Sequence, residues 1–271
     1  MFSLRLIAAG GVALCMLGTP AMAAQCGNGP AGFPAWLAAF KQEAVAAGIS
    51  PRVASSALDG LTYDAKVISL DRNQRVFKQS FEQFSGRMVN SHRINKGRAM
   101  MKAHAGLLSR IEKSFGVPGA VVVAIWALET DFGVNRGNMP VFRSLATLSY
   151  DCRRSAFFTD NLMGALKVVQ RGDLSPAQMR GAWAGELGQT QFMALNYYKY
   201  AVDFDGNGHR DLLRSVPDVL ASTANYLKGH GWQRGGGWQP GQANFGALLQ
   251  WNKSQVYAKT MALLATRLQG N

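Results

Sequence analysis

The residue best placed to do chemistry is a glutamate that follows a long uncharged segment. Residues 117–128 carry no charge, and the next residue is Glu129. On a helix, Glu129 shares a face with Ile125 and Trp126, one turn earlier. A carboxyl beside these apolar side chains loses water, which raises its pKa and suits it to act as a general acid near neutral pH. The alternative is an exposed glutamate near a helix C-terminus, where the helix dipole disfavours an acid.

Two nearby acids are candidates for a second carboxylate. Asp131 lies two residues after Glu129 and points about 160° away from it around a continuing helix, which makes it a poor partner. Glu186 lies in a glycine-rich loop over residues 185–188. Loops at helix ends often build binding clefts, so Glu186 is the stronger rival.

The segments that must position these residues read mostly as helices. Apolar residues recur at helical spacing, and alternating patterns typical of strands are scarce. Proline and glycine mark several boundaries. We predict a mainly α fold, with helices over Phe33–Ala47, from Pro51 to Gly60, over Ile94–Phe115 as one long helix, from a first turn at Pro118, over Ala156–Val169 and over Val216–Leu227, and an extended segment over Asp71–Gln83.

Residues 1–24 have the pattern of an export signal. Arg5 is the only charge in this segment, an apolar run follows over Leu6–Leu17, and Ala21-Met22-Ala23 forms an A-x-A cleavage signal. The apolar run is shorter than the roughly 20 residues that span a bilayer. We therefore expect secretion through the inner membrane into the periplasm, and no transmembrane span in the mature chain.

Composition and charge narrow the function further. The chain has 271 residues, 48% of them hydrophobic and 17% charged, which excludes a disordered protein. The net charge is +13, which on an exported protein favours an anionic extracellular polymer as partner. The basic residues are dispersed, so we expect no nucleic-acid binding.

The cysteines indicate one disulfide. Cys15 leaves with the signal, so Cys26 and Cys152 remain in a compartment that permits disulfides. A bridge between them would tie the N-terminal tail to the middle of the chain. The alternative is two free thiols.

Several motifs, in order along the chain, resemble those of the lytic murein transglycosylases of the membrane-bound B type, glycoside hydrolase family 103. The segment ALETDFG at 127–133 is similar to the stretch around that family's catalytic glutamate. The resemblance extends from Phe33 to Gln269. Its other motifs are YDCRR at 150–154, WAGELGQTQFM at 183–193, YAVDFDGNG at 200–208, ASTANYL at 221–227 and WNKSQVY at 251–257.

The resemblance implies a fold, a domain division and a reaction. It predicts a lysozyme-like helical domain over residues 25–271, with an N-terminal helical part at 25–100 and a catalytic core at 101–271. The family cleaves the β-1,4 bond between N-acetylmuramic acid and N-acetylglucosamine and leaves a 1,6-anhydromuramic end. One glutamate suffices because the sugar's own C6 hydroxyl attacks, whereas ordinary glycosidases need two carboxylates. Glu129 matches this glutamate, no cofactor is required, peptidoglycan glycan strands are the partner, and we take a monomer as the default.

Other residues match positions that line the family's cleft. Gln191 is expected to face the acetyl groups of the substrate, or else to be a buried amide satisfied by backbone. Glu186 occupies a variable family position, which favours a role in lining the cleft over catalysis. Ala182 and Ala194 depart from the usual Ser and Pro, which affects the details of substrate contact. The remaining expected substrate contacts are Tyr226, Trp251, Asn252, Tyr257 and the basic pair Arg153 and Arg154. The resemblance implies that this basic pair meets the peptide stem or the lactyl carboxylate, and a solvated surface pair is the alternative.

A candidate calcium loop begins at residue 203. Asp203, Asp205 and Asn207 fall at positions one, three and five of an EF-hand pattern, and His209 at position seven would bind through its carbonyl. Position twelve is an arginine, so Asp218 would have to close the site, as in some relatives. The alternative is an Asx-rich turn without metal.

Two further classes of function stay open. A peptidoglycan-binding or scaffold protein could keep the cleft without catalysis. A muramidase could instead use water as the nucleophile. Product identity separates the muramidase from the transglycosylase.

Overall fold

The computed structural model describes residues 24–73 and 79–270. The predicted signal peptide, residues 1–24, lies outside the described residues apart from Ala24. The helices are α1 (Phe33–Ala46), α2 (Pro51–Leu58), α3 (Ala65–Arg72), α4 (Phe81–Met88), α5 (Ser91–Ala103), α6 (Ala105–Phe115), α7 (Gly119–Thr130), α8 (Val141–Tyr150), α9 (Ser155–Arg171), α10 (Ala194–Tyr200), α11 (Val216–Gly229), α12 (Phe245–Trp251) and α13 (Gln255–Gln269).

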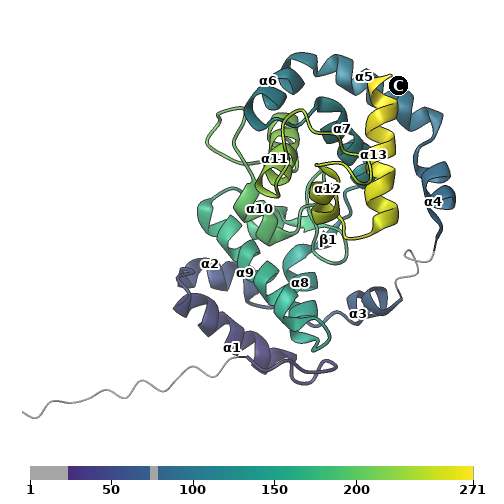
Figure 1. The fold of residues 1–271 in the computed structure, drawn as a ribbon. Coiled ribbons are helices and arrows are strands. Elements are labelled where there is room, and N and C mark those ends of the chain that lie inside the picture. Colours follow the sequence, from purple (N-terminus) through teal and green to yellow (C-terminus); the bar gives the residue numbers. More distant parts are fainter. Residues whose placement is uncertain (1–23, 74–78, 271) are drawn as a thin grey trace, which may run out of the picture.

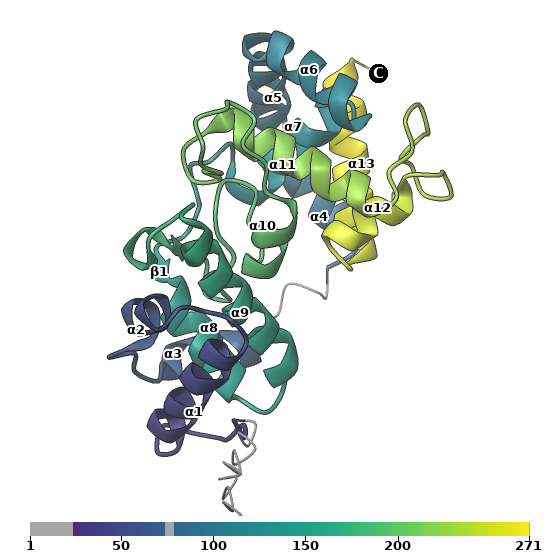
Figure 2. The same ribbon diagram turned by 90° about the vertical axis from the view of Figure 1, so that its left-hand side faces the viewer.

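The helices form two groups, which Figure 2 shows one above the other. In the lower group, α1 to α3 pack against α8 and α9. In the upper group, α4, α5, α12 and α11 surround α7 and α13, and α10 connects the groups by packing on both α9 and α11. A two-stranded antiparallel sheet of β1 (Met139–Pro140) and β2 (Arg180–Gly181) lies beside the lower group.

Helix α7 is the central element of the upper group, where it packs against α5, α6, α11 and α13 (Figure 1). Its sequence is apolar on every side, as expected for a fully enclosed helix. Eleven of its twelve residues are buried, and Glu129 is the exception. The helix therefore delivers one carboxyl to the surface of an otherwise apolar core.

The N-terminal helices are fastened to α8 by aromatic packing and by covalent bonding. Tyr150, at the end of α8, lies against the rings of Phe33, Trp36 and Tyr63. Next to it, Cys26 and Cys152 form a disulfide. The Gly27 N–H also donates to the carbonyl of Tyr150 at 2.8 Å. These contacts hold the tail, α1 and α8 together.

The prediction of a mainly α fold is confirmed, but the helices around His104 and Pro118 differ from expectation. The long helix predicted over Ile94–Phe115 is two helices, because His104 leaves the helical conformation (φ −109°, ψ 21°) and packs its ring against Trp126. Helix α7 begins at Gly119, with Pro118 as its N-cap.

The extended segment predicted over Asp71–Gln83 is wrong at both ends. Asp71 belongs to α3, and Gln83 completes a capping box with Ser80 that starts α4. Residues 74–78 lie outside the described residues.

The described residues contain no single helix with the length and apolar composition of a membrane span. Helices α6 and α7 together have the length and apolar composition of a span, but they are bent by 109° relative to each other.

Candidate active site

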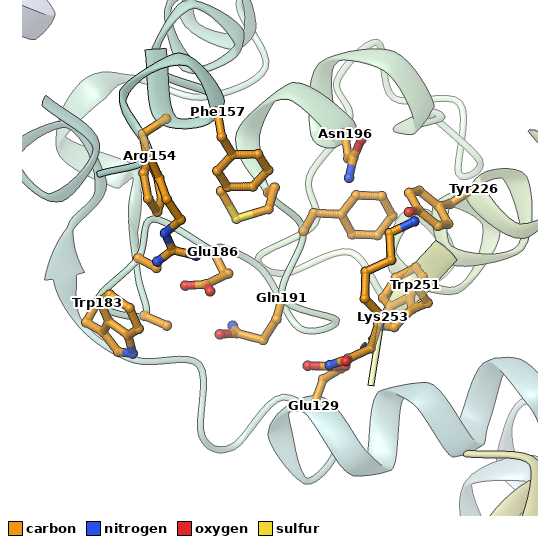
Figure 3. Close-up of a pocket in the computed structure, with 16 residues that line it drawn as sticks. Glu129, Arg154, Phe157, Trp183, Glu186, Gln191, Asn196, Tyr226, Trp251 and Lys253 are labelled. Atoms are coloured by element: carbon orange, nitrogen blue, oxygen red, sulfur yellow. Dashed lines mark hydrogen bonds between the residues drawn. The ribbon is translucent and has the colours of Figure 1, made fainter. Parts of the chain in front are cut away.

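A cleft of about 440 Å³ opens at the end of α7 (Figure 3). Glu129 faces it from α7, and Gln191 and Glu186 point into it from the loop before α10. Its other lining residues come from α9 to α12 and their loops: Arg154, Phe157, Phe158, Ala182, Trp183, Ala184, Phe192, Met193, Asn196, Tyr226, Trp251, Asn252 and Lys253.

Two donors bind the same oxygen of Glu129. Its Oε1 accepts from the indole Nε1 of Trp251 at 2.9 Å and from the hydroxyl of Tyr257 at 2.8 Å. No described residue donates to Oε2. Because both lone-pair directions of Oε1 are used, the proton of the neutral acid belongs on Oε2.

Burial raises the pKa of Glu129 to about 7. The hydrogen bonds from Trp251 and Tyr257 oppose this rise, and the nearby carboxylate of Glu186 adds to it. Burial and the adjacent Glu129 raise the pKa of Tyr257 well above its usual range, so its hydroxyl stays a donor. The site therefore holds an acid that can release and regain a proton near neutral pH.

The end of α7 is locked to the loop that carries Gln191. Thr130 Oγ1 donates to the carbonyl of Gln189 at 2.5 Å and accepts from the N–H of Gly133 at 2.8 Å. Trp126 Nε1 donates to Gln189 Oε1 at 3.0 Å. A Cβ on Gly133 would lie 2.4 Å from that same Oε1, so glycine is required at this position. These contacts explain the Thr and Gly that follow Glu129.

Left-handed backbone is concentrated at this site. Among the described residues, the non-glycine residues with positive φ are Asp131 (53°), Phe132 (62°) and Gln191 (52°). Such conformations each cost about 1–3 kcal/mol and persist where surrounding contacts enforce them. Two of them turn the chain directly after α7, and the third aims Gln191 at the cleft.

Gln191 has one side of its amide committed to the protein. Its Nε2 donates to the carbonyls of Gly188 at 3.0 Å and Arg136 at 3.2 Å. No described residue donates to its Oε1, which leaves this oxygen as an acceptor in the cleft. Gln191 can thus receive an N–H from a bound molecule.

Glu186 lines the same cleft with a partly unsatisfied carboxyl. Its Oε2 is buried and has no hydrogen-bond partner among the described residues. Burial raises the pKa of Glu186, while backbone N–H groups of Ala184 and Glu186 and the charge of Arg154 act in the opposite direction. The raised pKa brings this carboxyl closer to the range in which a group can act as a general acid or base near neutral pH.

The two predicted arginines take different places. Arg154 lines the cleft, whereas Arg153 is not among its lining residues. Both guanidinium groups form ion pairs with Asp71 of α3. The backbone N–H of Arg153 also donates to Asp151 Oδ1 at 3.0 Å.

The hydroxyl groups of the two predicted tyrosines, Tyr226 and Tyr257, already donate hydrogen bonds within the protein. The hydroxyl of Tyr226 donates to the carbonyl of Gln250 at 2.7 Å, so only its ring faces Trp251 and Phe192. Tyr257 holds Glu129 from behind and lines a neighbouring pocket instead of this cleft. Asn252 lines both.

Sequence reasoning missed several lining residues. Phe157 is 49% exposed, which is unusual for a phenylalanine, and its ring forms part of the cleft wall. Trp183, Asn196 and Lys253 also line it. Trp183 and Lys253 lie inside motifs that the sequence analysis quoted, but nothing in their spacing distinguished them from structural residues.

The predicted calcium loop brings three of its five residues together. Asp203, Asp205 and Asp218 each place a carboxylate oxygen within 4.8 Å of the others. Asn207 instead accepts the N–H of His209, whose ring lies near the carbonyl of Gly172. Three carboxylate oxygens fit a hard cation such as calcium, which needs further ligands from carbonyls or water.

Comparison with known proteins identifies the family of the chain. Residues 32–243 match the model of the transglycosylase SLT domain. The chain belongs to this transglycosylase family. The Escherichia coli membrane-bound lytic murein transglycosylase B is 33% identical over 154 residues, which are 56% of this chain and 42% of that protein. The chain thus aligns with less than half the length of this curated relative.

Solved structures of the transglycosylase family share the fold. SltB3 from Pseudomonas aeruginosa, in complex with NAG-anhNAM-pentapeptide, is 33% identical with a TM-score of 0.82, over 88% of this chain and 80% of that one. The Escherichia coli lytic transglycosylase Slt35, crystallised in complex with calcium, is 23% identical with a TM-score of 0.76, over 91% of this chain and 96% of that one.

Proposed function

We propose that this transglycosylase-family chain cleaves the β-1,4 bond between N-acetylmuramic acid and N-acetylglucosamine in peptidoglycan and forms 1,6-anhydromuramic ends. The observation that carries the proposal is the half-buried carboxyl of Glu129, which faces a cleft from the end of the otherwise buried helix α7 and has a pKa near neutrality. The similarity to SltB3, whose structure holds an anhydro-muropeptide, supports the same substrate class.

Glu129 first acts as the acid. Its Oε2 gives a proton to the glycosidic oxygen, the bond from C1 to that oxygen breaks, and N-acetylglucosamine leaves with a hydroxyl. The hydrogen bonds from Trp251 and Tyr257 then stabilise the carboxylate that forms.

The same carboxylate next acts as the base. It takes the proton of the C6 hydroxyl while O6 attacks C1 of its own sugar. The proton count closes because Glu129 ends the cycle protonated. No second carboxylate is needed, since the substrate supplies the nucleophile.

The other cleft residues are proposed to bind the glycan. Gln191 Oε1 accepts an acetamido N–H, and the rings of Phe157, Trp183, Tyr226 and Trp251 pack on sugar faces. Glu186 lines the same cleft and is proposed to contact the glycan. Asn252 and Arg154, which also line the cleft, contribute polar contacts.

The alternative is a muramidase, which adds water across the same bond and needs a second carboxylate. It would use Glu186 to activate water. Burial raises the pKa of Glu186, which is compatible with a general base, so the identity of the product distinguishes the two reactions.

Mass spectrometry of digested peptidoglycan tests the proposal. The wild-type protein should release muropeptides about 18 Da lighter than hydrolytic products, because each anhydro end lacks one water. Glu129→Gln keeps both hydrogen-bond acceptor contacts but carries no acid, so product should fall by about 10²–10⁴-fold. Reducing ends would show a muramidase. Binding without product by both proteins would show a scaffold.

We also propose that Asp203, Asp205 and Asp218 hold a structural calcium ion. The support is their mutual approach and the calcium in Slt35. At a calcium concentration 100 times its Kd, the folded state should gain about 2.7 kcal/mol. Asp205→Asn should abolish the calcium-dependent rise in Tm, whereas Asp59→Asn, outside the loop, should retain it. An unchanged Tm of the wild-type protein after calcium is added would contradict the proposed calcium site.

We place the protein in the periplasm as a binder of peptidoglycan strands. The disulfide between Cys26 and Cys152 supports a compartment outside the cytoplasm. The Escherichia coli relative is described as membrane-bound. Fractionation of cells that express the full chain would test the location.

A further inference from the structure

Two left-handed residues directly follow the helix that carries Glu129. Asp131 (φ 53°) is the C-cap of α7, and Phe132 (φ 62°) comes next. Residues other than glycine rarely adopt this conformation, so surrounding contacts must hold it. None of the described residues of α5 lines the cleft, yet this helix packs against α7 and reaches the turn.

Lys96 of α5 contacts both left-handed residues. Its Nζ donates to the backbone carbonyl of Asp131 at 3.3 Å and lies 4.9 Å from the centre of the Phe132 ring. The C-terminal end of a helix has unpaired carbonyls, and its dipole favours a cation there. The Lys96 side chain is 29% exposed, and partial removal from water strengthens the attraction between a cation and a ring. One side chain thus holds the carbonyl of the first residue and the ring of the second.

The ion pairs at the same turn fix its geometry less well. The Asp131 carboxylate lies 3.8 Å from Arg93 Nε and 3.9 Å from Lys96 Nζ, and both distances exceed the length of a hydrogen bond. Neither Arg93 Nε nor Asp131 Oδ1 has a hydrogen-bond partner among the described residues. Arg93 instead donates through Nη1 to the carbonyl of Met88. The carbonyl and ring contacts of Lys96 are therefore the ones that hold the backbone of the turn.

The turn connects Glu129 to the loop on the other side of the cleft. After the turn, the Gly133 N–H donates to Thr130 Oγ1 at 2.8 Å. Thr130 Oγ1 in turn donates to the carbonyl of Gln189, two residues before Gln191. A turn that relaxed toward ordinary backbone conformations would shift these contacts. The spacing between acid and amide would then change, and a misplacement of about 1 Å can reduce a rate about 100-fold.

We propose that Lys96 is a positioning residue, which holds the left-handed turn after α7 and thereby the spacing between Glu129 and Gln191. The inference rests on the proposed function, because this spacing serves the proposed cleavage. Loss of Lys96 should lower kcat more than it changes KM. The reason is that most of the rings proposed to pack on the glycan belong to other elements.

Amide hydrogen exchange tests the turn itself, without any substrate. Lys96→Met keeps the apolar stem of the side chain and removes the ammonium. The Gly133 amide, followed by NMR, should exchange about 10-fold faster in this variant, because the turn opens more often. Amides of α9 should keep their wild-type rates, which shows that the change is local.

Steady-state kinetics of peptidoglycan cleavage test the consequence. Measured well below the Tm of each protein, Lys96→Met should lower kcat about 10-fold or more and change KM by less than about threefold. Lys96→Arg should regain most of the lost kcat, because a guanidinium can also bind the carbonyl and stack on the ring.

Lys102→Met is the matched control. Lys102 lies on the same helix, and its exposed side chain forms no hydrogen bond or ion pair with any described residue. This variant should keep the wild-type exchange rate and kcat. Asp131→Asn removes both ion pairs and keeps the carbonyl and ring contacts, so its effects should be smaller than those of Lys96→Met.

Three results would overturn the proposal: an unchanged Gly133 exchange rate in Lys96→Met, faster exchange with unchanged kcat, or equal effects in Lys102→Met. If Lys96→Met does not fold, Phe132→Leu removes the ring contact with the charge kept, and it should also speed Gly133 exchange. A wild type that releases no anhydro product would contradict the proposed function. That failure is distinguishable, because the exchange measurement needs no substrate.

Discussion

At the scale of single residues, the chemistry of Glu129 depends on which of its oxygens the protein occupies. Trp251 and Tyr257 both donate to Oε1, so in the proposed reaction Oε2 carries the proton and meets the substrate. The same two donors stabilise the carboxylate after proton transfer, which keeps the pKa from rising further. Burial and hydrogen bonding thus set the pKa of Glu129 at a value that suits both an acid step and a base step.

This balance predicts opposite pH shifts for two variants. The acid must be protonated, so kcat/KM should fall above the pKa of Glu129, and at pH 8 about one molecule in ten keeps the proton. Glu186→Gln removes a negative charge, which lowers that pKa and moves the falling limb to lower pH. Trp251→Phe removes a donor to the carboxylate, which raises the pKa and moves the limb to higher pH.

Rates of glycan cleavage measured across pH 5 to 9 would decide this prediction. Gln170→Glu, at a site that contacts Gly48 and Ser50 instead of the cleft, is the control and should leave the limb in place. Shifts of the same sign in Glu186→Gln and Trp251→Phe would contradict the balance described.

Sequence reasoning reached Glu129 but not its surroundings. The spacing from Ile125 and Trp126 was sufficient to predict a desolvated carboxyl. The donors come from residues 122 and 128 positions later, and no local pattern links such distant positions. The family resemblance indicated Trp251 and Tyr257 as cleft residues, and only the folded chain places Tyr257 behind Glu129.

At the scale of elements, the site depends on how the end of α7 joins the loop over residues 182–193. Thr130, Gly133 and Gln189 make this joint, and the left-handed residues 131 and 132 turn the chain into it. The joint places Gln191 across the cleft from Glu129. Motif residues that do not touch the cleft therefore contribute by fixing the distance between those that do.

Gly133→Ala should disrupt this joint. Gly133 has φ +83°, and an added Cβ would lie 2.4 Å from Gln189 Oε1. Gly60→Ala is the matched control, because Gly60 has φ +76° with nothing within 4 Å of the added carbon. The left-handed backbone should lower the free energy of unfolding of both variants by about 1–2 kcal/mol. The close contact with Gln189 should destabilise Gly133→Ala further.

Urea unfolding of the two variants measures the difference directly. Gly60→Ala should keep wild-type kcat/KM, while Gly133→Ala should lose activity as well as stability. Equal destabilisation with equal activity would mean that the close approach to Gln189 is unimportant.

Element boundaries show what local sequence can and cannot specify. The buried character of α7 follows from its uncharged run, and the start of α2 follows from Ser50 and Pro51. The break at His104 does not, because apolar spacing continues through it and the ring is held by Trp126 of another helix. Tertiary contact decided that boundary.

At the scale of the whole molecule, the N-terminal part predicted as residues 25–100 divides between the two groups of helices. Helices α1 to α3 pack on α8 and α9, whereas α4 and α5 pack with α13. The domain division stays a prediction, since packing alone does not show which parts fold independently. The disulfide, the aromatic cluster around Tyr150 and the ion pairs of Asp71 with Arg153 and Arg154 all fasten the lower group near the cleft.

The disulfide should make a large contribution to global stability. It joins residues 126 positions apart, and a bridge across so long a segment restricts the unfolded chain strongly. Replacing both Cys26 and Cys152 by Ala should cost about 3–5 kcal/mol in the free energy of unfolding. Reducing agent should destabilise the wild type by a similar amount and leave the double variant unaffected. A wild type insensitive to reduction would contradict this prediction.

The central claim is that Glu129 alone suffices because the substrate, and not water, attacks C1. Digestion of peptidoglycan in oxygen-18 water tests it most directly. The account predicts anhydro products that contain no label at the muramic acid end. One oxygen-18 per new end, seen as a product about 2 Da heavier than in ordinary water, would show that water is the nucleophile and would contradict the claim.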